Sequence, residues 1–352
     1  MPLPMTDSPA PAPHRRRPRY AGKNPRRFED KYKERDPQRY GATVEKVLAS
    51  GKTPAGMHRP IMLAEILEIL APQPGEIAVD GTLGYGGHAQ EILARLQPGG
   101  RLLGLDVDPI ELPKTEDRLR ALGFGPDTFT AHRCNFAGLP RLLADEGITG
   151  AHLILADLGV SSMQLDDPAR GFSVKVNGPL DLRLNPQRGL PVAALLERMR
   201  PEACAALLTE NADEAHALIL GPALAGRLFA TTSALVAAIR KALAAALPRL
   251  TEEDIDLSLR RVFQALRIAV NDEFSALDTF LRNLPGSLAP GGRVAILTFH
   301  SGEDRRVKKS FAQGEREGLY VPTAGEVLRP TSSERRANPR STAAKLRWAR
   351  RA

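Results

Sequence analysis

The chain has 352 residues, of which 42% are hydrophobic and 26% are charged, which is typical of a globular protein and excludes a fibrous or fully disordered chain. No run of about eighteen apolar residues is present, so we expect no membrane span. Residues 2–13 are rich in Pro and Ala and do not form the hydrophobic segment of a signal peptide. Cys134 and Cys204 are far apart in the chain, which fits a reducing compartment, and we expect a cytoplasmic protein.

The net charge of +8 comes from the two ends of the chain. Residues 1–40 hold 11 Lys and Arg against 5 Asp and Glu, residues 301–352 hold 13 against 6, and the rest of the chain is therefore negative overall. Basic ends attract polyanions, because each phosphate that they neutralise releases counterions. This favours nucleic acid as a partner. Residues 1–50 are also typical of a basic, solvated, disordered extension.

From residue 58 onward, helical and strand patterns alternate along the chain. The predicted helices span residues 61–70, 88–96, 113–122 and 139–146, and the predicted strands span residues 76–80, 101–106, 128–133 and 152–157. Strands separated by helices of this length indicate right-handed βαβ units. We therefore predict an α/β fold with a parallel sheet.

The alternation is interrupted over residues 164–256. Residues 164–191 have the composition of a loop, and residues 201–209, 212–229 and 233–247 are predicted helices rich in Ala and Leu. In the last of these, Leu235, Ile239, Leu243 and Leu247 recur every four residues and predict one buried face. A helix over 257–281, a strand over 292–299, a helix over 304–311 and a strand over 345–348 then resume the α/β pattern. We expect residues 51–163 and 257–352 to form one domain, with residues 164–256 inserted into it.

A glycine-rich turn follows the first predicted strand, in the sequence DGTLGYGGH of residues 80–88. Glycine allows positive φ and close backbone approach, and the helix behind the turn presents free N–H groups. Asp106 ends the second predicted strand, where a carboxylate can accept hydrogen bonds from two ribose hydroxyls. The two features predict a nucleotide-cofactor site at this edge of the sheet. Residues 84–89 also fit G-x-G-x-x-A, so on this turn alone a dinucleotide remains open.

Two further strand ends place polar side chains at the same edge. Asp157 ends the fourth predicted strand and is suited to hold an amine, either of a cofactor or of a nucleobase. His300 follows the strand over 292–299 and is a candidate for contact with substrate or phosphate. The alternative for each is a structural role at the end of a strand, which is the weaker interpretation for Asp157.

Several longer stretches resemble the bacterial RsmH (MraW) methyltransferase family. They are residues 80–88, 105–109 (LDVDP), 157–186 (DLGVSSMQLDDPARGFSVKVNGPLDLRLNP), 261–273, 288–305 and 338–347. The resemblance spans about residue 56 to the C-terminus; residues 1–50 have no evident counterpart, and residues 210–250 follow the pattern poorly. It implies a Rossmann-like class I S-adenosylmethionine-dependent methyltransferase fold, with the inserted helical domain and the Arg-rich residues 170–188 available to hold RNA.

The resemblance also implies a reaction and its site. Methyl groups would pass from S-adenosylmethionine to the exocyclic N4 of a cytidine in the decoding region of small-subunit (16S) ribosomal RNA, free or in the ribosomal subunit. The implied cofactor contacts are Gly86, Gly87, His88, Asp106, Phe136, Asp157 and Gln164, of which Phe136 and Gln164 rest on the resemblance alone. Asp157, Asp166 and His300 are the tentative catalytic residues, with Asp167 and Ser161 as rivals. No metal and no membrane partner are expected, and a homodimer is one alternative for the oligomeric state.

Three other interpretations fit parts of the sequence. A nicotinamide-dependent oxidoreductase is supported by the G-x-G-x-x-A match, but no tyrosine begins a Y-x-x-x-K pair. A non-catalytic RNA-binding factor for ribosome assembly is supported by the basic ends. An N4-cytosine methyltransferase acting on another nucleic acid would share the chemistry, although such enzymes usually carry Pro-Pro-aromatic where this chain has Asp157-Leu-Gly-Val.

Overall fold

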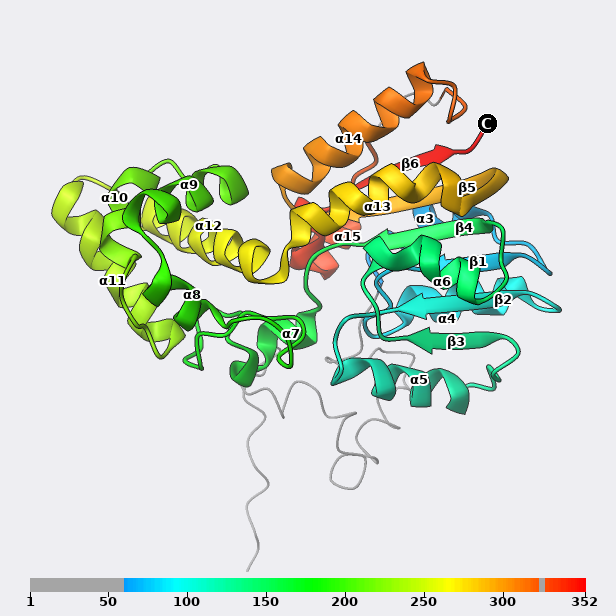
Figure 1. Cartoon of the computed structure of the whole chain (residues 1–352), viewed down its shortest axis with the longest axis horizontal. Helices are drawn as coiled ribbons and strands as arrows, with labels where there is room; N and C mark the ends of the chain where they lie inside the picture. The colour runs from blue at the N-terminus through cyan, green and yellow to red at the C-terminus, as the bar shows by residue number, and fades with distance from the viewer. Residues whose placement is uncertain (1–59, 323–326) are drawn as a thin grey trace, which may run out of the picture. The chain divides into compact units, whose positions relative to one another are not determined.

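A six-stranded sheet with the order β3-β2-β1-β4-β5-β6 organises the described residues, 60–322 and 327–352, of the computed structural model (Figure 1). The strands are β1 (Ile77–Asp80), β2 (Arg101–Leu105), β3 (Phe129–His132), β4 (Ala151–Asp157), β5 (Leu288–Thr298) and β6 (Lys345–Arg350). The first five are parallel, and β6 is antiparallel to β5. The predicted α/β class and parallel sheet are confirmed, whereas the predicted extension over residues 1–50 lies outside the described residues.

Helices cover both faces of the sheet because its strands are apolar on both sides. Val79 and Ile154 point into a core formed with α6 (Leu139–Asp145), α13 (Glu273–Ser287) and α14 (Ser301–Arg316). Their neighbours Ala78 and Leu153 point the other way, into a core formed with α3 (Leu63–Leu70), α4 (Gly87–Leu96) and α5 (Glu111–Ala121). The strand order reverses between β1 and β4, which creates the switch point where open α/β sheets bind ligands.

The helical part has a hydrophobic core of its own. It is formed by α8 (Val192–Arg198), α9 (Pro201–Ala212), α10 (Ala217–Leu224), α11 (Thr232–Ala246) and α12 (Glu252–Asn271). The predicted face of α11 is confirmed for Leu235, Ile239 and Leu243, which are fully buried, whereas Leu247 follows the helix and is only partly buried. In Figure 1, α12 runs from this core to the sheet. Because α12 contributes Val262 to the helical core, that core extends past the predicted domain boundary at residue 256. The role of residues 164–256 as a separate RNA-recognition domain stays a prediction.

Three predicted elements differ in detail. Residues 257–281 are mostly helical as predicted, but they belong to two helices, because Asp272 takes a left-handed conformation with φ 52° and ends α12. The helix over 212–229 is reduced to α10, because Asp213 is also left-handed and ends α9. The loop over 164–191 contains the end of α7 (Ser162–Asp166) and a 3-10 turn at Pro168–Arg170. Asp tolerates the left-handed region better than most residues, so both breaks are inexpensive.

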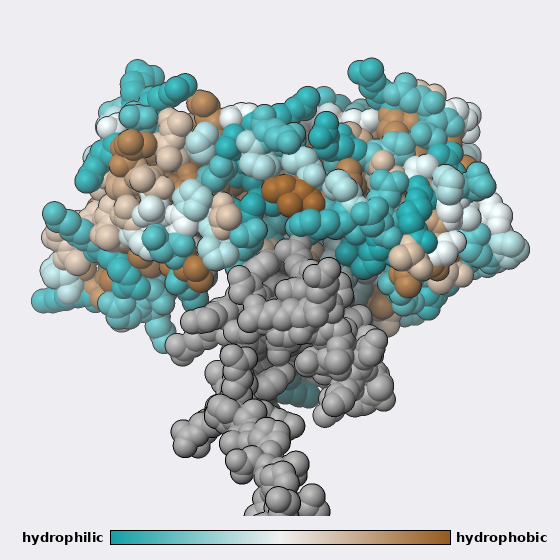
Figure 2. Space-filling view, turned by 90° about the horizontal axis from the view of Figure 1, so that it is seen from below, coloured by the Kyte–Doolittle hydropathy of each residue, from teal (hydrophilic) through white to brown (hydrophobic). Residues whose placement is uncertain are grey.

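The surface is mainly hydrophilic on the face that Figure 2 shows, with hydrophobic residues in small separate patches. Large exposed apolar side chains include Leu218 on α10 and Leu228 just beyond it. Single exposed side chains of this kind are normal in globular proteins. Among the described helices, none combines the length and the apolar character needed to cross a bilayer.

Candidate functional site

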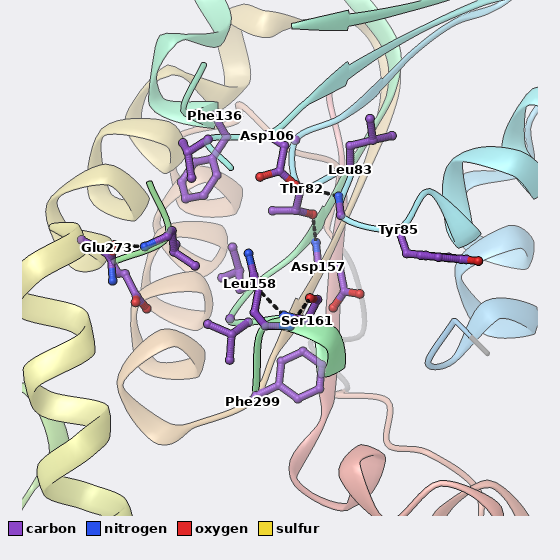
Figure 3. Close-up of a pocket in the computed structure, with 18 of the residues that line it drawn as sticks. Thr82, Leu83, Tyr85, Asp106, Phe136, Asp157, Leu158, Ser161, Glu273 and Phe299 are labelled. Atoms are coloured by element: carbon purple, nitrogen blue, oxygen red, sulfur yellow. Dashed lines mark hydrogen bonds between the residues drawn. The ribbon is translucent and has the colours of Figure 1, made fainter. Parts of the chain in front are cut away.

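A cavity of about 410 Å³ opens at the carboxyl ends of β1, β2 and β4, where the sheet meets α12 and α13 (Figure 3). Seven residues expected at a cofactor site all line it, namely Gly86, Gly87, His88, Asp106, Phe136, Asp157 and Gln164. They come from four separate stretches of the sequence. The structure therefore brings together the residues that were predicted to act together.

The glycine turn between β1 and α4 has a shape that other residues would disturb. Gly86 has φ 77° and precedes the first turn of α4, which no side chain caps. A Cβ atom at Gly86 would lie 2.8 Å from Cγ2 of Thr115, and one at Gly87 would lie 2.7 Å from Cγ of Pro60. Thr115 also fixes the turn by donating a hydrogen bond to the carbonyl of Gly84. The free N–H groups of α4 are thus held at the wall of the cavity.

We expect Gly86→Ala to lower the free energy of unfolding more than Gly84→Ala. Both positions have positive φ, which costs an L-residue about 1–2 kcal/mol. Only at Gly86 does the new methyl group collide with Thr115, since the nearest atom to a Cβ at Gly84 is 3.6 Å away. Overpacking adds about 1–3 kcal/mol. Urea denaturation of both variants measures the difference, and equal losses would contradict the collision.

Asp106 follows β2 and lines the cavity, and each of its carboxylate oxygens accepts a hydrogen bond from a backbone N–H group. Oδ2 accepts a hydrogen bond from the N–H of Gly84 at 2.8 Å, and Oδ1 accepts one from the N–H of Asp108 at 2.9 Å. Each oxygen can accept a second hydrogen bond. Burial raises the pKa of Asp106 to about 6 and the negative charge of Asp108 adds to the rise, although the backbone N–H groups of Asp108, Gly84 and Val107 act against it. The side chain is therefore mostly ionised at neutral pH and can accept two hydroxyl donors.

Asp157 lies at the end of β4, next to the glycine turn. Its backbone N–H donates to Oγ1 of Thr82 at 2.6 Å, as drawn in Figure 3. Burial raises the pKa of Asp157 to about 7, and the negative charges of Asp80 and Glu303 add to the rise. The carboxyl group is therefore balanced between its neutral and ionised forms at neutral pH, which suits an acid–base role.

His88 is the buried neighbour of Asp157. Its Nε2 lies 3.0 Å from the carbonyl oxygen of Ile61, which can only accept, so Nε2 carries the proton. Nδ1 is then an acceptor, 3.7 Å from Oδ2 of Asp157. Burial lowers the pKa of His88 to about 4, so the ring is neutral at neutral pH. The pair is not an ion pair; His88 offers Asp157 a neutral acceptor.

Phe136 and Gln164 both line the cavity. Phe136 follows β3 and packs edge-on against Phe280 of α13, with ring centroids 5.2 Å apart. Gln164 belongs to α7, accepts a hydrogen bond from the N–H of Ser161, and donates one to Oδ2 of Asp108 at 2.8 Å. Its amide is thus held by the protein, and its contact with a cofactor stays a prediction.

His300 and Asp166 are not among the described residues that line the cavity. His300 precedes α14, where Nδ1 accepts from the N–H of Glu303 and Nε2 lies 3.1 Å from Oε1 of the same residue. Asp166 accepts a hydrogen bond from Arg340 at 2.6 Å. Because neither side chain lines the cavity, their tentative catalytic roles stay predictions that their positions do not support.

The junction of α12 and α13 contributes residues for which the sequence indicated no role. Arg267, Asn271 and Glu273 line the cavity. Arg267 donates to both carboxylate oxygens of Glu273 at 2.8 Å, and Asn271 binds the backbone of residues 182 and 184. The only available signal was the stretch RVFQALRIAVNDE, which carried the resemblance without a function.

Glu273 also belongs to a possible metal-ligand group. Potential ligand atoms of Glu273, His300 and Glu303 lie within 4.8 Å of one another. However, the guanidinium group of Arg267 already occupies both oxygens of Glu273 and would repel a cation. Arg267 and Glu273 form an ion pair at this wall of the cavity.

The glycine turn after β1, the acidic residue after β2 and the parallel sheet with its antiparallel edge strand β6 fit an S-adenosylmethionine-dependent methyltransferase of the class I type, and the family match establishes this class. The chain belongs to the MraW methylase family, whose model matches residues 55–352. It is 48% identical to ribosomal RNA small subunit methyltransferase H 1 of Lachnoclostridium phytofermentans, over 96% of this chain and 93% of the relative. It is also 48% identical to methyltransferase H 2 of Alkaliphilus metalliredigens, over 95% and 97%.

These matches correct one expectation about residues 1–50. A match over 96% of the chain must include most of them, so the N-terminal extension does have a counterpart in those relatives. The enzyme of Halorhodospira halophila, 41% identical, matches only 86% of this chain but 97% of its own length.

Proposed function

We propose that this chain transfers a methyl group from S-adenosylmethionine to the exocyclic N4 of a cytidine in the decoding region of small-subunit ribosomal RNA. The observation that carries the proposal is Asp157, a carboxyl group with a pKa of about 7 at the wall of the donor cavity. The names of the relatives support ribosomal RNA of the small subunit as the substrate. The resemblance in residues 157–186 supports the choice of cytidine N4.

The residues of the cavity fit the methyl donor. The cavity volume of about 410 Å³ lies in the usual range of small-ligand sites, about 300–1,000 Å³. The spare lone pairs of Asp106 suit two ribose hydroxyls, and Gly86 and Gly87 leave room for close approach of a ligand to the backbone. Phe136 offers an aromatic surface for a purine. When bound, S-adenosylmethionine supplies an electrophilic methyl group on its sulfonium.

Asp157 performs the step that the nucleobase requires. The N4 amine is a weak nucleophile because its lone pair is delocalised into the ring. In its ionised form, Asp157 would accept a hydrogen bond from N4 and take up the N4 proton, while N4 gains the methyl group and the donor leaves as the neutral thioether. A base with a pKa near the working pH is the most effective. His88 stays neutral and keeps its Nδ1 lone pair beside Asp157.

The substrate must present an unstacked base, because a carboxylate inside this cavity cannot reach N4 in a stacked helix. Single-stranded or looped RNA meets this requirement. The side of the cavity formed by Ser161, Leu165 and Leu184 belongs to the segment that leads into the helical part, so we place the nucleobase there and the donor against the glycine turn.

Nucleoside mass spectrometry of small-subunit RNA tests the proposal. A strain lacking the gene should lose N4-methylated cytidine, and a plasmid copy of the gene should restore it. An unchanged profile of methylated cytidine would refute the proposed target. Incubation of the purified protein with labelled donor and RNA from the deletion strain distinguishes the alternatives. Binding without transfer would favour an assembly factor, and transfer to DNA but not RNA would favour another nucleic acid.

A further inference from the structure

Asp108 is a fully buried carboxylate outside the proposed chemistry, and its side chain forms four hydrogen bonds. Oδ1 accepts from the N–H groups of Ile110 and Glu111, and Oδ2 accepts from Gln164 and Arg170, both at 2.8 Å. Two of these donors are local, and two come from residues 56 and 62 positions further along the chain. Asp108 therefore joins the turn after β2 to a distant segment.

The same residue also contacts the donor side of the cavity. The backbone N–H of Asp108 binds Oδ1 of Asp106, the carboxylate proposed to hold the ribose. Any shift of Asp106 on ligand binding moves the backbone of Asp108, and with it the two side chains that Asp108 holds. The link consists of direct hydrogen bonds among buried groups, so little movement is absorbed along it.

Arg170 extends the link to the opposite wall. It is only 7% exposed, although it begins the Arg-rich segment expected to hold RNA. One terminal nitrogen of its guanidinium binds Asp108, and the other donates to the carbonyl oxygens of Arg183 and Leu184 at 3.2 and 2.8 Å. Leu184 lines the cavity, whereas residues 166–183 do not. Arg170 thus clamps the two ends of this segment instead of facing solvent.

We infer that Asp108 is a positioning residue that couples the donor turn to residues 167–184, the segment bordering the proposed nucleobase side. Binding of the donor at Asp106 then orders this segment through Asp108 and Arg170, and the wall is set before the RNA arrives. The role of the segment in holding RNA rests on the proposed function. The coupling itself concerns only this chain and the donor.

Hydrogen–deuterium exchange with and without S-adenosylmethionine tests the coupling. In the wild type, donor binding should slow exchange in peptides covering residues 167–183, which do not line the cavity. Asp108→Asn should still bind the donor in calorimetry, because the backbone N–H to Asp106 remains, but should lose this protection. Equal protection in both proteins, or loss of donor binding along with the protection, would overturn the inference.

Two further variants separate positioning from general stability. Arg170→Lys keeps a positive charge beside Asp108, but it puts one nitrogen in place of the two that bind Asp108 and the carbonyl oxygens separately, so it too should lose the protection. Full protection in this variant would count against the clamp. Glu76→Gln is the matched control. It breaks a partly buried ion pair with Arg293 at the opposite end of the strands, so it should lower the melting temperature and leave the protection unchanged.

Kinetics give a second readout. With small-subunit RNA, Asp108→Asn should lower kcat by about 100-fold, the usual cost of a misplaced reacting group, with an unchanged KM for the donor. An unchanged kcat would overturn the inference. If the wild-type protein methylates no RNA at all, the proposed function fails, and the exchange experiment alone decides on the coupling.

Discussion

Replacing Asp157 with Asn should reduce methyl transfer by about 10²–10⁴-fold, the usual contribution of a positioned base. Asn has the same shape and can still accept a hydrogen bond from an amine, but it cannot receive a proton. Because the backbone N–H of residue 157 keeps its hydrogen bond to Thr82, the turn should stay in place. Single-turnover transfer of labelled methyl groups at saturating donor measures the loss, and calorimetry checks that the donor still binds.

The pH dependence identifies the base more directly. Asp157 can receive a proton only in its ionised form, and its pKa of about 7 means that it is mostly protonated at lower pH. The wild-type rate should therefore rise with pH through about 7 and level off above it. This rise should be absent from Asp157→Asn. If that variant keeps the rise, another group is the base.

Asp80 provides the control for this assignment. It is buried, its pKa is also raised to about 7, and its charge contributes to the raised pKa of Asp157. Asp80→Asn removes a like charge, so the pKa of Asp157 should fall and the rise in rate should move to lower pH. A rise that disappears in Asp80→Asn would assign the titration to Asp80 instead.

The sheet and the donor side of the cavity could be predicted from the sequence because their signals are local. Short apolar strands alternate with helices, and the polar residue after each strand lies at the carboxyl edge by geometry alone. Asp106 and Asp157 were found in this way. The glycine turn was found because positive φ and close approach require glycine at Gly86.

The other wall could not be predicted because it depends on pairing over long distances in the chain. Nothing in the sequence pairs Asp108 with Arg170, and the Arg-rich segment was therefore expected to hold RNA. The break between α12 and α13 at Asp272 was also missed, since an Asp inside a helical pattern does not signal a left-handed residue. That break is what brings Asn271 and Glu273 to the cavity.

Asp106→Ala should weaken binding of S-adenosylmethionine by about 100-fold or more. Two hydrogen bonds from ribose hydroxyls to a carboxylate are together worth about 3 kcal/mol or more, which corresponds to this change in Kd. Ala is a better choice than Asn at this position. The two carboxylate oxygens of Asp106 accept hydrogen bonds from the N–H groups of Gly84 and Asp108, and the NH2 group of an Asn would face one of these donors. Isothermal titration of folded protein measures the change.

Asp117→Ala is the matched control for this loss. It removes the same side chain from the exposed face of α5 and should leave the affinity unchanged.

Wild-type affinity for S-adenosylmethionine should also fall as the pH is lowered through about 6, because Asp106 must be ionised to accept both hydroxyls strongly. Titration with NAD completes the test: if NAD bound and S-adenosylmethionine did not, the G-x-G-x-x-A match would be a dinucleotide turn. If Asp106→Ala bound S-adenosylmethionine as tightly as the wild type, the ribose would have to lie elsewhere in the cavity.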